Sequence, residues 1–264
     1  VDKPFLSRHF SSNDGDLYKC LYLAAGPHLT PSSIEGDLVG VKDPDINYRP
    51  IYDLQTNEET SKHAALKSFV HNLDTLSGQD LVDYLDANFD VDSFIRYLAI
   101  GIYISNLDDY RFLANNYYLY FNDKGKIEFI PYDFDISLGT NWHGDLPYEE
   151  YIDQDIFSTV NLPATWGDDS PRPLVDRVLA VDKYRQRYVQ LLKDDALAAN
   201  KLFVFSQYQA KFDQLFALYG DKTDSDTMDS DPMGLAGYEQ EYFVDKTKNV
   251  LDQLKVGYAG YEVE

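Results

Sequence analysis

The chain has 264 residues, of which 44% are apolar and 15% aromatic, a composition that favours a folded domain with a sizeable core over disorder. Lys and Arg number 23 against 45 Asp and Glu, so the formal charge is −22, which disfavours nucleic acid and anionic membrane surfaces as partners. The single cysteine, Cys20, excludes an internal disulfide, and no run approaches the roughly 18 apolar residues of a membrane span.

The first sixty residues are predicted to form short strands and loops. Residues 15–23 indicate a turn followed by a strand, and residues 24–50 are rich in Gly, Pro, Asp and Ser. The chain begins Val-Asp-Lys-Pro-Phe, without Met and without the features of a signal peptide. We therefore interpret residues 1–60 as a remnant that adjoins a missing N-terminal lobe.

Two helices are predicted next. Residues 61–76 place Leu66, Phe69, Val70 and Leu73 on one helical face. A second helix, for which Asp92 is the expected N-terminal cap, places Ile95, Leu98, Ala99 and Ile102 at helical spacing and ends near residues 105–106. Further helices are expected over 173–218 and over about 238–254.

A β-hairpin is predicted between these helical regions. Residues 116–121 are aromatic and β-prone, residues 122–125 form a turn, and residues 126–130 alternate between apolar and polar. A polar loop, residues 106–110, precedes the hairpin, and Asp133-Phe134-Asp135 follows it after Pro131.

The acidic and amide residues around this hairpin follow the order used by protein kinases. A kinase places a loop Asp, then an Asn, then a hairpin, then the Asp of Asp-Phe-Gly, and together these groups position the acceptor hydroxyl and hold magnesium. Asp108, Asn116 and Asp133 stand in that order. The separation from Asp108 to Asn116 is 116 − 108 = 8 residues, against about five in the kinase signature. The pattern thus predicts phosphoryl transfer by an atypical kinase.

The same residues resemble the CotH kinase family. The resemblance is carried by residues 106–110 (Asn-Leu-Asp-Asp-Tyr), 115–120 (Asn-Asn-Tyr-Tyr-Leu-Tyr) and 129–135 (Phe-Ile-Pro-Tyr-Asp-Phe-Asp). Residues 17–19, 90–98, 173–179 and 184–188 also resemble the family, so the likeness covers most of the chain.

The resemblance implies roles for individual residues. Asp108 would be the catalytic aspartate, while Asn116 and Asp133 would be ligands of Mg²⁺ in a complex with ATP. Lys19 and Asp135 are weaker candidates for cofactor binding, and Asp109 is an alternative to Asp108. The acceptor would be a Ser or Thr hydroxyl of a protein substrate, and the family implies an extracellular, cell-envelope or spore-associated location.

The expected fold is α+β and kinase-like: a single domain over 1–264, in which 61–264 form a mainly helical C-terminal lobe around a catalytic hairpin at 106–139. The chain lacks the Arg-Gly-Asn-Ser-Ser run and nucleotide-binding lysine usual upstream in the family. Two alternatives therefore stay open: an inactive kinase-like binding module, and a carbohydrate hydrolase that uses Asp108 and Asp133 as its carboxylate pair.

An Asp-rich segment, residues 221–231, is predicted to be a mobile, solvated loop without a catalytic part. A calcium loop beginning at Asp229 would place Gly234 correctly, but its twelfth residue is Gln240 instead of Glu.

Overall fold

A computed structural model describes residues 1–23, 25–138, 148–158, 170–197, 201–219 and 239–255. Within them lie the strands β1 (Gly15–Cys20), β2 (Val39–Gly40), β3 (Tyr52–Leu54), β4 (Tyr117–Asn122) and β5 (Ile127–Pro131). The α-helices are α1 (Lys3–His9), α2 (Ala64–Thr75), α3 (Gly78–Asn88), α4 (Val91–Ile104), α5 (Tyr110–Leu113), α6 (Tyr148–Ile152), α7 (Pro173–Ala180), α8 (Asp182–Leu197), α9 (Gln209–Tyr219) and α10 (Glu239–Gln253). Short 3₁₀ turns are η1 (Pro31–Ile34), η2 (Gly36–Leu38) and η3 (Phe205–Gln207). The mixed α+β class is confirmed, and the Asp-rich segment 221–231 lies outside the described residues.

The predicted hairpin belongs to a five-stranded sheet with the order β2-β3-β1-β4-β5. Strands β4 and β5 pair antiparallel, as expected, and β1 pairs antiparallel with the other edge of β4, from Gly15 opposite Asn122 to Cys20 opposite Tyr117. The N-terminal strands therefore share one sheet with the hairpin instead of standing apart from it.

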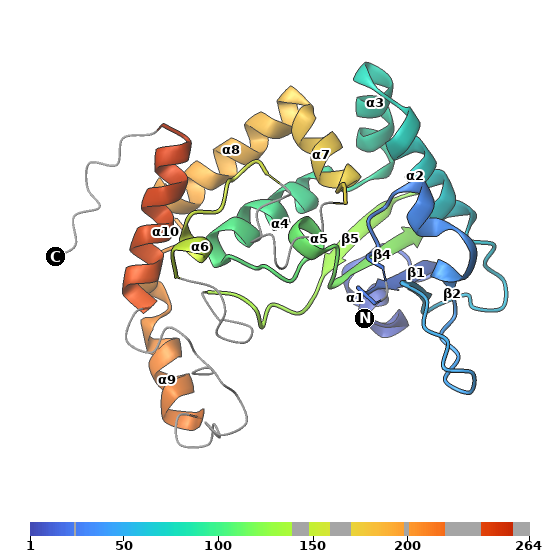
Figure 1. The fold of residues 1–264 in the computed structure, drawn as a ribbon, viewed down its shortest axis with the longest axis horizontal. Coiled ribbons are helices and arrows are strands. Elements are labelled where there is room, and N and C mark those ends of the chain that lie inside the picture. Colours follow the sequence, from blue (N-terminus) through green and yellow to red (C-terminus); the bar gives the residue numbers. More distant parts are fainter. Residues whose placement is uncertain (24, 139–147, 159–169, 198–200, 220–238, 256–264) are drawn as a thin grey trace.

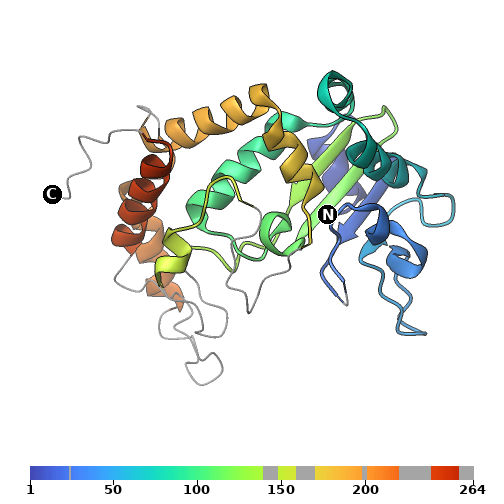
Figure 2. The ribbon, with the colours of Figure 1, turned by 45° about the horizontal axis from the view of Figure 1, so that its top comes forward.

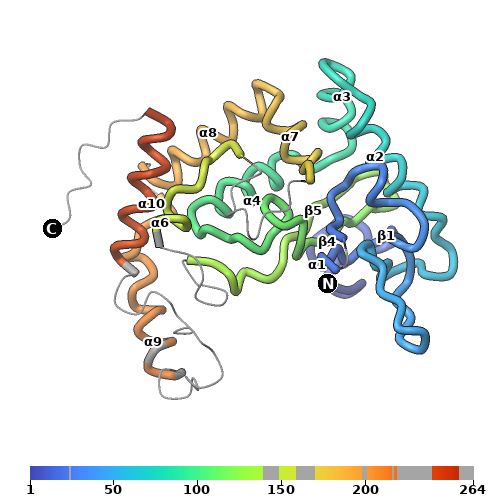
Figure 3. Tube along the Cα trace, in the orientation of Figure 1, coloured from blue at the N-terminus to red at the C-terminus, as the bar shows by residue number. Residues whose placement is uncertain are grey.

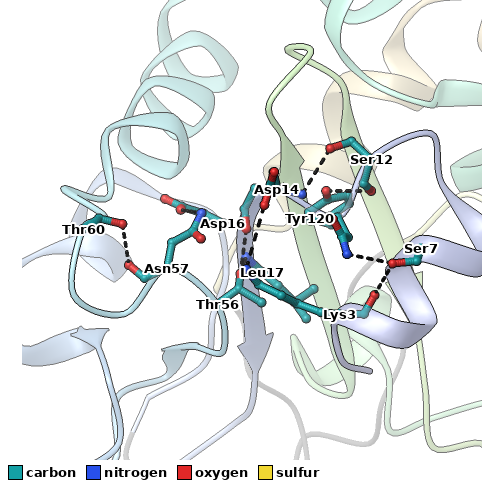
Figure 4. Close-up of polar contacts among 12 residues, drawn as sticks. Lys3, Ser7, Ser12, Asp14, Asp16, Leu17, Thr56, Asn57, Thr60 and Tyr120 are labelled. Carbon is teal, nitrogen blue, oxygen red and sulfur yellow. Dashed lines mark hydrogen bonds and ion pairs between the residues drawn. The ribbon is translucent and has the colours of Figure 1, made fainter.

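Side-chain hydrogen bonds fix the start of β1 at the end of the sheet shown in Figure 4. The Thr56 hydroxyl accepts from the Leu17 amide at 2.9 Å and donates to the Gly15 carbonyl at 2.6 Å. The Tyr120 hydroxyl donates to the Ser12 carbonyl at 2.9 Å. These contacts anchor β1 beside β4 at the end opposite Asn116.

The two faces of the sheet are covered differently. Because side chains alternate along a strand, Tyr18 and Cys20 face the main core while Leu17 faces a smaller cluster with Leu6 of α1. The main core continues into α2, α4, α7 and α8. Figures 1 and 2 show the sheet at one end of the molecule, α10 at the other, and α4 between them with α8 alongside it.

Helix α4 is the central helix and is apolar on most of its surface. It begins at Val91, where the Asp90 carboxylate accepts a hydrogen bond from the Ser93 amide at 3.2 Å. The expectation that Asp92 caps this helix is thus wrong by two residues, because Asp92 already lies in the first turn, where its charge still favours the helix dipole. Helices α1, α3, α5 and α6 were not predicted.

Two buried cations hold the segment around α6 against the helical lobe. Lys246 of α10 donates to the carbonyls of Tyr151 and Ile152 at 2.6 and 3.1 Å. Arg111 of α5 donates to the carbonyls of Ile156 and Ser158 at 2.7 and 2.9 Å. Both cations are almost fully buried, so the segment next to the predicted catalytic loop is fixed from two helices. None of the helices that the structure describes is long and apolar enough to cross a membrane.

Candidate active site

The predicted catalytic loop begins where α4 ends. Ser105 takes a left-handed backbone conformation with φ 48°, which stops the helix and turns the chain. The Leu107 amide then donates to the Ile136 carbonyl at 3.3 Å, and the Leu138 amide donates to the Ile104 carbonyl at 2.5 Å. These two bonds lay residues 104–107 beside residues 136–138, so the loop before the hairpin and the segment after it meet.

The two open ends of the hairpin also meet. The Tyr132 amide donates to the Asn116 carbonyl at 3.1 Å. Asn116 and Asp133 have φ angles of 56° and 59°, in the left-handed region that Asn and Asp tolerate better than most residues. Both therefore leave the strand direction at the same end of the sheet, next to the loop that carries Asp108. The connected trace of these segments can be followed in Figure 3.

Asp108 is held through both of its carboxylate oxygens. The Asn115 amide group donates to Oδ1 at 2.7 Å, and the Asn116 amide group donates to Oδ2 at 2.8 Å and to the Asp108 carbonyl at 2.9 Å. The Asn115 Oδ1 atom accepts from the Tyr22 amide at 2.8 Å, which sets the orientation of the Asn115 side chain. Asp108 is thus half-buried and fixed in one orientation.

Asp108, Asp133 and Asp135 share one electrostatic environment. Burial raises the pKa of the Asp108 carboxyl against the hydrogen bonds from Asn115 and Asn116, and the nearby Asp133 raises it further. Burial likewise raises the pKa of Asp135, with Asp133 and Asp108 adding to the effect. No salt bridge joins these three acids to a Lys or Arg in the described part of the chain. The site therefore gathers negative charge that a cation would neutralise.

The oxygen atoms at this site are of the kind that magnesium prefers. Asp133 and Asp135 are exposed, and the Asn116 amide group donates to Asp108, so that its Oδ1 atom is left without a donor among the described residues. Over the described ranges, no group of three or more His, Cys, Asp or Glu side chains is close enough to enclose an ion. Magnesium is commonly held by one or two carboxylates together with substrate phosphates, so Asp133 with Asn116 fits that mode better than a closed protein cage.

Asp109 occupies a different environment from its neighbour. It is only 3% exposed, its Oδ1 atom caps α5 by accepting from the Phe112 amide at 3.0 Å, and its Oδ2 atom accepts from the Tyr97 hydroxyl at 2.7 Å. Burial raises the pKa of Asp109 to about 6. Both oxygens are engaged within the core, so Asp108 is the more accessible of the two candidates.

Lys19 lies on β1 near the same end of the sheet. Its Nζ atom is 5.1 Å from the centroid of the Tyr132 ring, and Tyr132 directly precedes Asp133. Its backbone pairs with Tyr118 on β4 and with Asp53 on β3. Within the described residues the half-buried Lys19 makes no ion pair, and it brings positive charge close to an otherwise acidic site.

Sequence reasoning missed Asn115 as a member of this site. Asn115 and Asn116 form a doublet directly before a strand, which offered a signal, since two adjacent amides at a turn can present donors to one acceptor. The doublet could be read as a family motif, but the pairing of each amide with one Asp108 oxygen depends on the left-handed turn at Ala114 and Asn116.

This α+β chain, with an acid–amide cluster at the open end of a hairpin, matches the model of a known protein family. The matching model is described as CotH kinase protein and covers residues 1–253. The chain therefore belongs to the CotH kinase family. It is also 24% identical over 173 residues to the inner spore coat protein H of Bacillus subtilis (strain 168), a match that covers 60% of this chain and 43% of that protein. The matched region thus spans less than half the length of this relative.

Proposed function

We propose that the chain is an ATP-dependent phosphotransferase that moves the γ-phosphate of ATP to Ser or Thr hydroxyls of a protein substrate. The observation that supports this most strongly is the Asp108 carboxylate, held through both oxygens by Asn115 and Asn116. A carboxylate fixed in this way is preorganised to orient a hydroxyl and to take its proton, as a kinase requires. Membership of the CotH kinase family agrees with the proposal.

In this proposal Asp108 and Asp133 have different roles. Asp108 orients the acceptor hydroxyl and accepts its proton at a carboxylate oxygen. Asp133 and Asn116 would hold Mg²⁺, which would neutralise the negative charge of the ATP phosphates. Asp135 adds a second exposed carboxylate next to Asp133, and Lys19 supplies positive charge near Tyr132.

The location proposed for the protein follows from its relative. Because the chain is similar to an inner spore coat protein, we propose that it acts in association with a spore, on proteins of that environment. The overall charge of −22 favours basic protein segments as substrates over acidic ones.

The transfer itself is tested with ATP labelled in its γ-phosphate, Mg²⁺, and a basic generic acceptor protein. We expect label to appear in phosphoserine or phosphothreonine, and we expect Asp108→Asn to lower the rate by about 10²–10⁴. Asp80→Asn, which removes an exposed acid from the first turn of α3, is the control and should keep the parental rate.

Absence of transfer by the folded parent protein with Mg²⁺, accompanied by retained nucleotide binding, would identify an inactive binding module instead. Transfer at the parental rate by Asp108→Asn would remove Asp108 from the catalytic role.

A further inference from the structure

A cavity of about 290 Å³ lies in the helical part of the molecule, away from the acid–amide cluster. Its walls come from α4, from the end of α8 and the segment after it, from α9 and from α10. Five aromatic side chains line it: Tyr103, Phe203, Tyr208, Phe212 and Phe243. Its volume is near the lower end of the range for small-molecule sites, so it suits a small ligand.

The aromatic rings form a connected group. Phe203 and Phe243 stack with centroids 4.1 Å apart, Tyr103 lies 4.8 Å from Phe203, and Tyr208 lies 6.0 Å from Phe243. The faces of such rings carry negative potential and attract cations, above all organic ammonium ions. In the described part of the chain, no Lys or Arg lies over the rings of Phe203, Tyr208, Phe212 or Phe243.

One acidic side chain, Asp195 of α8, lines the same cavity. Asp195 is only 8% exposed, yet its carboxylate accepts no hydrogen bond and makes no salt bridge with any residue that the structure describes. Exposed Arg96 attracts this carboxylate and neighbouring Asp194 repels it, but neither forms a hydrogen bond or salt bridge with it. Its carboxylate oxygens are not among the buried atoms that lack a partner, so solvent reaches them and they are open to a cationic ligand in the cavity.

We propose that this cavity binds a small organic ammonium ion, whose apolar substituents pack against the aromatic rings and whose charge lies at Asp195. The aromatic rings can pack against the apolar substituents of such a ligand, and the Asp195 carboxylate can pair with its charge. A purely apolar ligand would leave Asp195 without a partner. The proposal goes beyond phosphoryl transfer and does not depend on it.

The cavity also borders the chain segments that carry the candidate active site. Ile104 and Leu138 line it, and the backbone bond between them joins the loop that leads to Asp108 with the segment that follows Asp135. A bound ammonium ion would therefore pack against both segments.

Calorimetric titration tests the proposal with two compounds of equal size, phenethylammonium and the neutral 2-phenylethanol. At neutral pH we expect the ammonium ion to bind at least about tenfold more tightly than the alcohol. Asp195→Asn keeps the shape of the side chain but removes the charge, and it should abolish this preference while leaving binding of the alcohol within about twofold. Asp194→Asn, on the adjacent and less buried acid, is the matched control and should keep the preference.

A second variant tests the location without changing any buried residue. Ile100 is 38% exposed at the rim of the cavity, and Ile100→Trp should weaken binding of both compounds by narrowing the entrance. Equal affinity of the two compounds for the parent protein would overturn the proposal. So would a preference that survives in Asp195→Asn, unchanged binding by Ile100→Trp, or absence of binding up to about 10 mM, which is weaker than a small ligand in a matching site should be.

Discussion

Asp108 depends on two adjacent amides for its orientation. Asn115 and Asn116 each donate to a different carboxylate oxygen, and Asn115 is itself fixed by the Tyr22 amide. A chain of bonds thus runs from the segment after β1, through Asn115, to the acid proposed to take the proton. Small displacements of a reacting group are costly in catalysis, so Asn115 acts as a positioning residue in this account.

Asn115→Ala should lower the turnover number for phosphate transfer by about 10- to 100-fold, because the Asp108 carboxylate loses one of its two fixed donors. The Michaelis constant for ATP should change less than about threefold, since Asn115 is not among the proposed magnesium ligands. Steady-state kinetics measure both quantities. Asn88→Ala, which removes an amide that donates to the Tyr84 carbonyl on α3, is the control and should leave both unchanged. A parental turnover number in Asn115→Ala would refute the positioning role.

Asp109 should make stability depend on pH. Burial raises its pKa from 3.8 to about 6, so the folded protein binds more protons than the unfolded chain between these values. The contribution of Asp109 to the free energy of unfolding therefore falls as pH rises through that window, by on the order of 3 kcal/mol. Chemical denaturation of the parent and of Asp109→Asn across this pH range should show the difference.

In that comparison the free energy of unfolding of Asp109→Asn should increase relative to that of the parent as pH rises, because the amide has no charge to bury. Asp74→Asn, at an exposed position on α2, is the control, and its free energy of unfolding should match that of the parent at every pH. Parallel curves for the parent and Asp109→Asn would mean that Asp109 is solvated like an ordinary surface acid.

The elements predicted most accurately are those whose pattern is local. The hairpin at β4 and β5, α2, and the body of α4 follow from alternation or helical spacing of apolar residues that are buried in the structure. Helix α1 begins with Pro and buries a single residue, and α5 has only four residues. Neither helix has enough apolar periodicity to be recognised from the sequence. The cap of α4 was misplaced because Asp90 and Asp92 are both plausible caps by sequence.

The pairing of β1 with β4 could not be predicted, because it joins residues about a hundred positions apart. The two strands approach closely at Gly15, where a β-carbon would lie 2.2 Å from the Phe121 carbonyl oxygen. Backbone, and not a flexible side chain, stands in the way, so no rotamer change can relieve the overlap.

Gly15→Ala should therefore destabilise the protein by about 2 kcal/mol or more and speed hydrogen exchange in β1 and β4 together. Exchange followed by mass spectrometry reports each strand separately. Gly101→Ala is a useful control, because its β-carbon would meet Asp109 at an ordinary 3.6 Å within a helix. That variant should be as stable as the parent. Faster exchange confined to β1 would show that β4 does not depend on this pairing.

At the scale of the whole molecule, the fold brings three acids and two amides to the open end of one hairpin in a chain of charge −22. The order of these residues along the sequence indicated a kinase-like site, but their mutual distances depend on the backbone bonds between residues 104–107 and 136–138. Such a surface repels ATP, itself a polyanion, unless a divalent cation accompanies it. Metal dependence of nucleotide binding is therefore central to the account.

The most direct test is calorimetric titration of ATP into the parent protein, Asp133→Asn and Asp108→Asn, each with Mg²⁺ and with a chelator. The parent protein is expected to bind ATP only with Mg²⁺. Asp133→Asn should weaken that binding at least about tenfold, since it removes a carboxylate that would hold the ion. Asp108→Asn should bind within about threefold of the parent, because Asp108 is proposed to act on the acceptor hydroxyl. Binding that persists in the chelator, or an Asp133→Asn variant that binds Mg-ATP like the parent, would contradict the account.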